Sequence, residues 1–181
     1  MIGFQDIWLI SDTHWDHSRI IEFSSRPFKD ADEMNEILIE NWNKVVKPND
    51  LIFHLGDVFF CGAQKMKYIS DRLNGRKTLI KGNHDKSSNT KYRKLGFEPY
   101  NYYVFEELLL SHYPQQITPL RSLYNNTDII ANAHGHVHEQ VQGLDKDLHY
   151  CVSVENINYT PIHVDQIYSD VAKGVRPYEI K

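Results

Sequence analysis

Hydrophobic residues recur along the chain in two patterns, one typical of buried strands and one typical of helices that face a core. Short apolar runs predict strands at residues 7–10, 51–55 and 78–81. Residues 30–46 and 63–73 carry apolar side chains at three- and four-residue spacing, which is typical of helices with one buried face. The first half of the chain therefore alternates strand and helix.

The second half of the chain is richer in predicted strands. A βαβαβα order followed mainly by strands predicts an α/β layered domain whose second half is more antiparallel. Residues 11–28 are polar and are expected to be irregular. The later predicted elements are a helix at 89–95, strands at 102–105, 108–111, 128–133 and 148–154, and a terminal helix at 164–173.

Composition narrows the class of protein. A length of 181 residues without a linker-like stretch predicts a single domain over residues 1–181. The formal net charge of −4, without a basic stripe, argues against an extended nucleic-acid footprint. No apolar stretch reaches membrane-spanning length and the N-terminus does not resemble a signal peptide, so no membrane partner is expected. Cys61 and Cys151 lack metal-type spacing, and reduced thiols in a cytoplasmic protein are expected.

Polar residues that commonly bind metals follow the predicted strands repeatedly. In open α/β sheets, ligands bind outside the carboxyl ends of the strands, so these side chains are expected to share one rim. Carboxylates, an amide and imidazoles without thiolates suit Mn, Fe, Zn or Ni, whereas structural zinc sites are usually rich in cysteine. The residues at strand ends are Asp12 and His14, Asp57, Asn83 and His84, His112, and His136 and His138.

Glycines accompany three of these positions, at Gly56, Gly82 and Gly135. A glycine permits the tight turns and close backbone approach that a compact metal site needs. Not every one of the ten histidines fits that pattern. A structural role is expected for His54, His149 and His163, and a core or supporting role for His134.

Taken in order, these motifs resemble those of the calcineurin-like metallophosphoesterase family. The resemblance implies a four-layer α/β/β/α sandwich and a hydrolase that cleaves phosphate esters with a hydroxide bridging two divalent metal ions. One departure is Phe60, which stands where the family often has an acidic or polar residue, and it bears on the substrate. The matching motifs are Asp12-x-His14, Gly56-Asp57, Gly82-Asn83-His84-Asp85, His112 and Gly135-His136-x-His138.

The resemblance also implies a role for each residue. His84 is the expected catalytic histidine, which assists the leaving group, and Asp85 is its expected orienting partner. The remaining residues are expected ligands. The first metal would be held by Asp12, His14 and His138, the second by Asn83, His112 and His136, and Asp57 would bridge them.

The substrate is less tightly specified. His17, Arg19 and Arg26 follow the first ligand motif and are candidate phosphate contacts, with a solvated loop as the alternative. Residues 113–127 form the longest insert, which can only rim the site. Few basic groups and a small chain favour small phosphodiesters with manganese over monoesters or nucleic acid, although a phosphomonoesterase or nuclease remains an alternative. The oligomeric state is left open.

Two other classes of protein compete with this interpretation. A metallo-β-lactamase-like hydrolase would explain the segment His134-Gly-His136-Val-His138, but Glu139 and Gln140 follow where an Asp-His continuation is expected. A non-catalytic scaffold with the same fold would be expected to lose ligands, and here all of them are present. Turnover of a chromogenic phosphodiester with manganese added and withheld discriminates against the scaffold.

Overall fold

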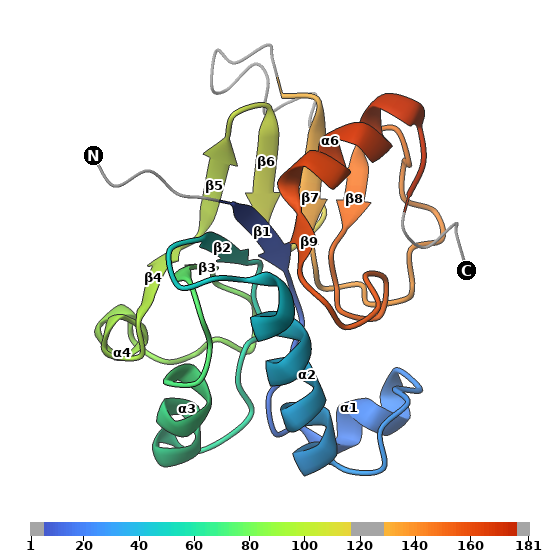
Figure 1. Ribbon diagram of the computed structural model, residues 1–181. Coiled ribbons are helices and arrows are strands. Elements are labelled where there is room, and N and C mark those ends of the chain that lie inside the picture. The colour runs from blue at the N-terminus through green and yellow to red at the C-terminus, as the bar shows by residue number, and fades with distance from the viewer. Residues whose placement is uncertain (1–5, 117–128, 177–181) are drawn as a thin grey trace.

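The computed structural model describes residues 6–116 and 129–176, which form a mixed α/β arrangement of two sheets with helices (Figure 1). The five-stranded sheet has the order β4-β3-β2-β1-β9. Strands β1 to β4 pair in parallel, and β9 runs antiparallel to β1. The strands are β1 (Ile7–Ile10), β2 (Leu51–His54), β3 (Arg76–Ile80), β4 (Phe97–Tyr100) and β9 (Ile162–His163).

The four-stranded sheet has the order β5-β6-β7-β8. Only β5 and β6 pair antiparallel, whereas β6, β7 and β8 are parallel. Among the described strands, both antiparallel pairs, β5–β6 and β1–β9, involve strands of the second half, as expected, but the other two pairs of this sheet are parallel. Residues 112–130 and 135–148 are long enough for the crossovers that parallel strands require. The strands are β5 (Tyr102–Phe105), β6 (Leu108–Ser111), β7 (Ala131–His134) and β8 (His149–Cys151).

The longest helix is the one that the apolar spacing predicts most clearly. It begins after Asp30, whose side chain accepts a hydrogen bond from the backbone N–H of Glu33, and it buries Met34, Leu38 and Trp42. Capping and burial of one face together explain why this segment is helical. The helices are α1 (Ser18–Phe23), α2 (Ala31–Val45), α3 (Ala63–Ser70), α4 (Asn89–Lys94) and α6 (Val164–Lys173).

The two sheets contact each other through aromatic side chains. The ring of Phe53 in β2 lies 5.3 Å from that of Tyr103 and 5.6 Å from that of Phe105, both in β5. Helix α6 covers β8, where the Tyr150 hydroxyl donates to Asp170 at 2.7 Å (Figure 1). Two sheets packed between helices confirm the layered fold class expected from the sequence.

Several elements differ from the prediction. Helix α1 lies in a segment expected to be irregular, and β4 and β9 were not predicted, because each is short and depends on its neighbours. Helix α3 ends at Ser70, and β8 spans only His149–Cys151. Residue 128 of the predicted strand 128–133, and most of the insert 113–127, lie outside the described residues.

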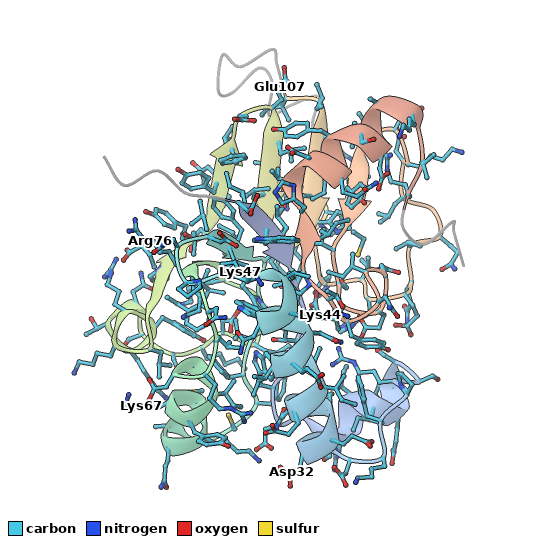
Figure 2. All side chains as sticks on the ribbon, in the orientation of Figure 1. Asp32, Lys44, Lys47, Lys67, Arg76 and Glu107 are labelled. Atoms are coloured by element: carbon cyan, nitrogen blue, oxygen red, sulfur yellow. The ribbon has the colours of Figure 1, made fainter. Side chains whose placement is uncertain are left out.

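The outer surface carries dispersed charge. Figure 2 labels Lys44, Lys47, Lys67 and Arg76, which are exposed; Lys44 and Lys47 are neighbours at the C-terminal end of α2, whereas Lys67 lies on α3 and Arg76 in β3. None of the helices within residues 6–116 and 129–176 combines the length and apolar character needed to cross a bilayer.

Candidate metal centre

The carboxyl ends of β1 and β2 and the turn after β7 bring a first group of ligand atoms together. Nε2 of His14 lies 4.0 Å from Oδ1 of Asp12 and 3.8 Å from Oδ2 of Asp57. Nε2 of His138 lies 3.9 Å from the same Asp12 oxygen. Residues separated by more than 120 positions in the sequence thus converge on one point, where Asp12, His14 and His138 could hold a metal ion.

A second group shares Asp57 with the first. Nε2 of His112 lies 3.5 Å from Oδ2 of Asp57 and 3.0 Å from Oδ1 of Asn83. The ring of His136 is 5.1 Å from that of His112, centroid to centroid. One carboxylate oxygen of Asp57 therefore faces both groups, and Asp12, Asp57 and His112 could also hold an ion.

Unsatisfied polar atoms test whether the site suits a metal. Among the described residues, Oδ1 of Asp12 and Nε2 of His14 are buried without a hydrogen-bond partner, although they face each other. Buried polar atoms are nearly always paired, and an orphaned pair is costly. A divalent cation would satisfy both atoms, and imidazole with carboxylate is a suitable donor set for a transition metal. The residues present therefore fit a metal.

The backbone at these positions is strained. Left-handed conformations cost a non-glycine residue on the order of 1–2 kcal/mol, and they persist where surrounding structure imposes them. Such strain concentrates at functional sites, which is consistent with selection for ligand placement over local stability. The expected ligands with positive φ are Asp12 (56°), His14 (50°), Asp57 (57°), His136 (70°) and His138 (50°).

Two of the neighbouring glycines allow ligands to approach the backbone closely. A Cβ atom on Gly82 would collide with Oδ1 of Asp57, and one on Gly135 would collide with Oδ2 of Asp12. The sequence prediction that glycine is needed beside the ligands agrees with this geometry.

Burial sets the protonation of the imidazoles. It lowers the pKa of His14 far below its usual range, and the neighbouring His138 and Arg26 lower it further. Burial also lowers the pKa of His136, and it raises the pKa of Asp57. Neutral imidazoles keep the lone pair that a metal requires, so the site is prepared for coordination near neutral pH.

Two residues that were not predicted from the sequence form hydrogen bonds with expected ligands of the first group. The Ser153 hydroxyl donates to Oδ2 of Asp12 at 2.8 Å. Oε1 of Glu155 lies 3.0 Å from Nδ1 of His138. Burial alone would lower the pKa of His138, but this bond and the Asp12 carboxylate raise it. Both residues follow β8, but the predicted strand extended to residue 154, so the strand-end rule would have pointed to Glu155 and not to Ser153.

Arg26 is not positioned to contact substrate, and that prediction is corrected. The residue is only 4% exposed. Its guanidinium donates to Oε1 of Glu155 at 2.6 Å and to the backbone carbonyls of Asp12 and Thr13 at 2.7 and 3.0 Å. Arg26 therefore stabilises the loop that carries Asp12 and Thr13, from the interior of the protein. Arg19 is exposed on α1 and stays a predicted phosphate contact.

His17 lies beside the first ligand group. Its Nδ1 is 3.3 Å from Nδ1 of His14, and its ring stacks on Phe60 with centroids 4.0 Å apart. Phe60 also contacts the ring of His84 at 4.7 Å. The residue that departs from the family pattern thus packs between two histidines at the rim.

His84 and Asp85 have different surroundings. Nε2 of His84 lies 3.9 Å from Oδ2 of Asp57, and the His84 side chain is 43% exposed, so it can reach a substrate. The Asp85 carboxylate instead accepts hydrogen bonds from the backbone N–H groups of Asp57 (2.7 Å), Gly82 (2.9 Å) and Val58 (3.2 Å). The Tyr92 hydroxyl donates to it at 3.0 Å. The predicted role of Asp85 in orienting His84 is therefore wrong, because its described bonds hold the two ligand turns together.

His54 has the structural role that was expected. The Gly56 N–H donates to its Nδ1 at 3.2 Å, so the proton resides on Nε2, which bonds the Thr13 hydroxyl at 2.9 Å. Burial lowers the pKa of His54 to about 3. His134, for which a core or supporting role was expected, is fully buried, and burial lowers its pKa to about 4.

A two-sheet α/β domain that gathers these side chains at the ends of its strands is of the metallophosphoesterase class. The chain belongs to the calcineurin-like phosphoesterase family, because the model of that family matches residues 6–180. This match confirms the family resemblance drawn from the motifs.

Two proteins of known sequence and one of known structure are similar to this chain over different shares of their length. An uncharacterized protein of Methanocaldococcus jannaschii, MJ1445, is 37% identical over 176 residues, which are 96% of this chain and 95% of that protein. The Gene 66 protein of Mycobacterium phage L5 is 39% identical over 83 residues, covering 43% and 39% of the two chains. The crystal structure of AQ665 from Aquifex aeolicus, a protein of unknown function, superposes with a TM-score of 0.72 at 32% identity, covering 91% of this chain and 98% of that one.

Proposed function

We propose that this protein hydrolyses small phosphodiesters with the help of two divalent metal ions. The observation that carries the proposal is the orphaned pair of Asp12 Oδ1 and His14 Nε2, which belongs to a cluster with Asp57 at its centre. The metal pair supplies, when bound, an activated water near neutral pH and positive charge against the phosphoryl oxygens. In the proposed arrangement Asp12, His14 and His138 hold one ion, Asn83, His112 and His136 hold the other, and Asp57 bridges them.

The proposed catalytic residue is His84. Its exposed ring stands beside Asp57 but makes no described bond that would keep it from a substrate, and an imidazole can donate a proton to the leaving oxygen. The backbone N–H of His84 donates to Oδ1 of Asp57 at 2.9 Å, which holds the residue at the edge of the ligand cluster. Phe60 packs against the ring and limits its rotation.

A preference for diesters is supported by the small number of available cations. A phosphomonoester carries an additional negative charge, which needs further basic partners. Arg26 is committed to Glu155, and the amine of Lys81 donates to the Ser87 carbonyl at 3.2 Å. The dispersed surface charge gives a long polyanion little further attraction.

The proposed location of the protein is the cytoplasm. Free Cys61 and Cys151 support it, because thiols stay reduced there.

The test compares kcat/KM for bis(4-nitrophenyl) phosphate with that for 4-nitrophenyl phosphate, at fixed manganese concentration and modest salt. We expect higher kcat/KM for the diester and loss of turnover when the metal is chelated. A clear preference for the monoester, or efficient cleavage of duplex DNA with little diesterase activity, would replace the proposed substrate class. Absence of any metal-dependent turnover would favour a non-catalytic scaffold.

A further inference from the structure

A cavity opens beside the second ligand group. It has a volume of about 290 Å³ and lies between the end of β3 and the β5–β6 pair. Ligand His112 forms part of its wall, so an occupant would lie next to a phosphate held at the proposed metal centre. The other residues used in the argument below are Lys81, Asn101, Tyr102, Tyr113 and Gln115.

The wall of this cavity is aromatic. The ring of Tyr113 lies 4.4 Å from that of His136 and 5.0 Å from that of His112, so it continues directly from the ligand cluster. Tyr113 is 44% exposed and Tyr102 is 48% exposed. Exposed aromatic rings beside a pocket are typical of a binding surface.

Two exposed tyrosines, Tyr102 and Tyr113, line the cavity, and two more lie on the neighbouring strands β4 and β5 without lining it. Within the described part of the chain, most of the exposed large hydrophobic side chains come from β4, β5 and the segment after β6, which lie near one another in Figure 1. A concentration of this kind at one edge suits stacking against a flat ring. These side chains are Tyr100, Tyr102, Tyr103 and Tyr113.

Polar groups in the same wall suit the edge of a heteroaromatic ring. The side-chain amides of Asn101 and Gln115 each offer both donors and an acceptor, which can pair with ring nitrogens and exocyclic groups. The backbone N–H of Gln115 donates to Oδ1 of Asn132 at 2.7 Å, which fixes this segment against β7. The Lys81 amine, which donates to the Ser87 carbonyl, also lines the cavity.

We infer that this cavity binds the nucleobase of a nucleotide substrate whose phosphate is held at the metal centre. Tyr102 and Tyr113 contribute stacking surface, and the two amides read the edge of the base. The inference rests on the proposed function for the position of the phosphate, and it adds the chemical class of the group attached to that phosphate.

The test is isothermal titration calorimetry of the manganese-loaded protein with adenosine 5′-monophosphate and with ribose 5-phosphate, which lacks only the base. Stacking on an aromatic side chain strengthens the binding of a base, so we expect the nucleotide to bind about 5- to 150-fold more tightly. In the Tyr102→Leu/Tyr113→Leu double variant the preference for the nucleotide should be clearly smaller, because only the contacts of the two amides remain. The Tyr68→Leu variant is the matched control, because Tyr68 is 56% exposed on α3, away from the cavity, and it should keep the difference.

Equal affinity of the wild-type protein for the two ligands would overturn the inference, whatever the folding of the variants. A preference for the nucleotide that is undiminished in the folded double variant would also overturn it. Turnover of bis(4-nitrophenyl) phosphate by the wild-type protein separates the two proposals. If the protein hydrolyses the diester but binds the nucleotide and ribose 5-phosphate equally, only this inference is contradicted. If it prefers the nucleotide but does not hydrolyse the diester, only the proposed function is contradicted.

Discussion

Oε1 of Glu155 lies 3.0 Å from Nδ1 of His138, and the other nitrogen of that ring faces Asp12 at 3.9 Å. A carboxylate on the far nitrogen of a ligand histidine fixes the tautomer and makes the ring a stronger donor. Glu155 is held in turn by Arg26. We therefore expect metal binding at the first group to depend on the buried ion pair between Glu155 and Arg26, although neither side chain is among the proposed ligands.

Replacing Glu155 by glutamine should weaken the first metal site by about 10- to 100-fold, because the charge behind His138 is lost. The second site should change little, since Nδ1 of His112 contacts the Leu55 carbonyl at 2.8 Å instead. Chelator competition on the folded variant measures both affinities. The matched control is Glu98→Gln, at an exposed pair with Arg93. Unchanged affinity at the first site, or equal loss at both sites, would contradict this role.

Replacing His84 by alanine should lower turnover by about 100- to 10,000-fold while leaving metal content nearly intact, because the ring is proposed to act on the leaving group and not as a ligand. The loss should be smaller for an ester with a good leaving group, which needs less protonation. Steady-state kinetics on alkyl and nitrophenyl diesters, with metal analysis of the same samples, checks both statements. Wild-type rates on the alkyl diester would remove His84 from the mechanism.

Replacing Asp57 by asparagine should weaken both metal sites together, because one carboxylate oxygen faces both ligand groups. Loss of affinity at a single site would show that Asp57 does not bridge. Asp50→Asn is a comparison at another buried carboxylate, which accepts hydrogen bonds from Trp8 and Lys47 away from the cluster. That variant should lower stability without selectively changing metal affinity. Calorimetric titration with manganese measures the affinities.

Acid should destabilise the metal-free protein partly through His54. Burial lowers the pKa of His54 from 6.5 to about 3, so the unfolded chain binds this proton more readily than the folded chain. The stability due to neutral His54 is present above pH 6.5 and is lost as the pH falls toward about 3. The slope that it contributes approaches about 1.4 kcal/mol per pH unit.

The His54→Asn variant removes this proton and should show a shallower loss of unfolding free energy between pH 6.5 and 4. Urea denaturation of the metal-free proteins across this range measures the difference between the two curves. Above pH 7 the curves should run parallel, which serves as the internal control. Parallel curves over the whole range would mean that His54 is not buried in its neutral form.

The ligand cluster could be predicted from the sequence because its polar side chains directly follow predicted strands, and the carboxyl ends of parallel strands meet at one edge of a sheet. Asp12, Asp57 and Asn83 each follow a strand of the same parallel sheet, so their convergence follows from topology alone. The main helix α2 was equally clear, since its apolar spacing and its cap at Asp30 agree. Such features need no knowledge of distant contacts.

Other features depend on contacts that sequence spacing does not record. Arg26 resembled a phosphate contact until its partner Glu155, 129 positions away, placed it inside the protein. Asp85 sits next to His84 in the chain, yet its oxygens turn toward the backbone of Asp57 and Gly82. Helix α1 is too short to have a diagnostic period, and its position depends on burying Ile20.

The central claim is that this cluster binds two metal ions in one chain. The most direct measurement is elemental analysis by mass spectrometry of the wild-type protein, saturated with manganese, freed of excess metal and shown to be folded by circular dichroism. The account predicts two manganese ions per chain. One ion or none per folded chain would contradict it.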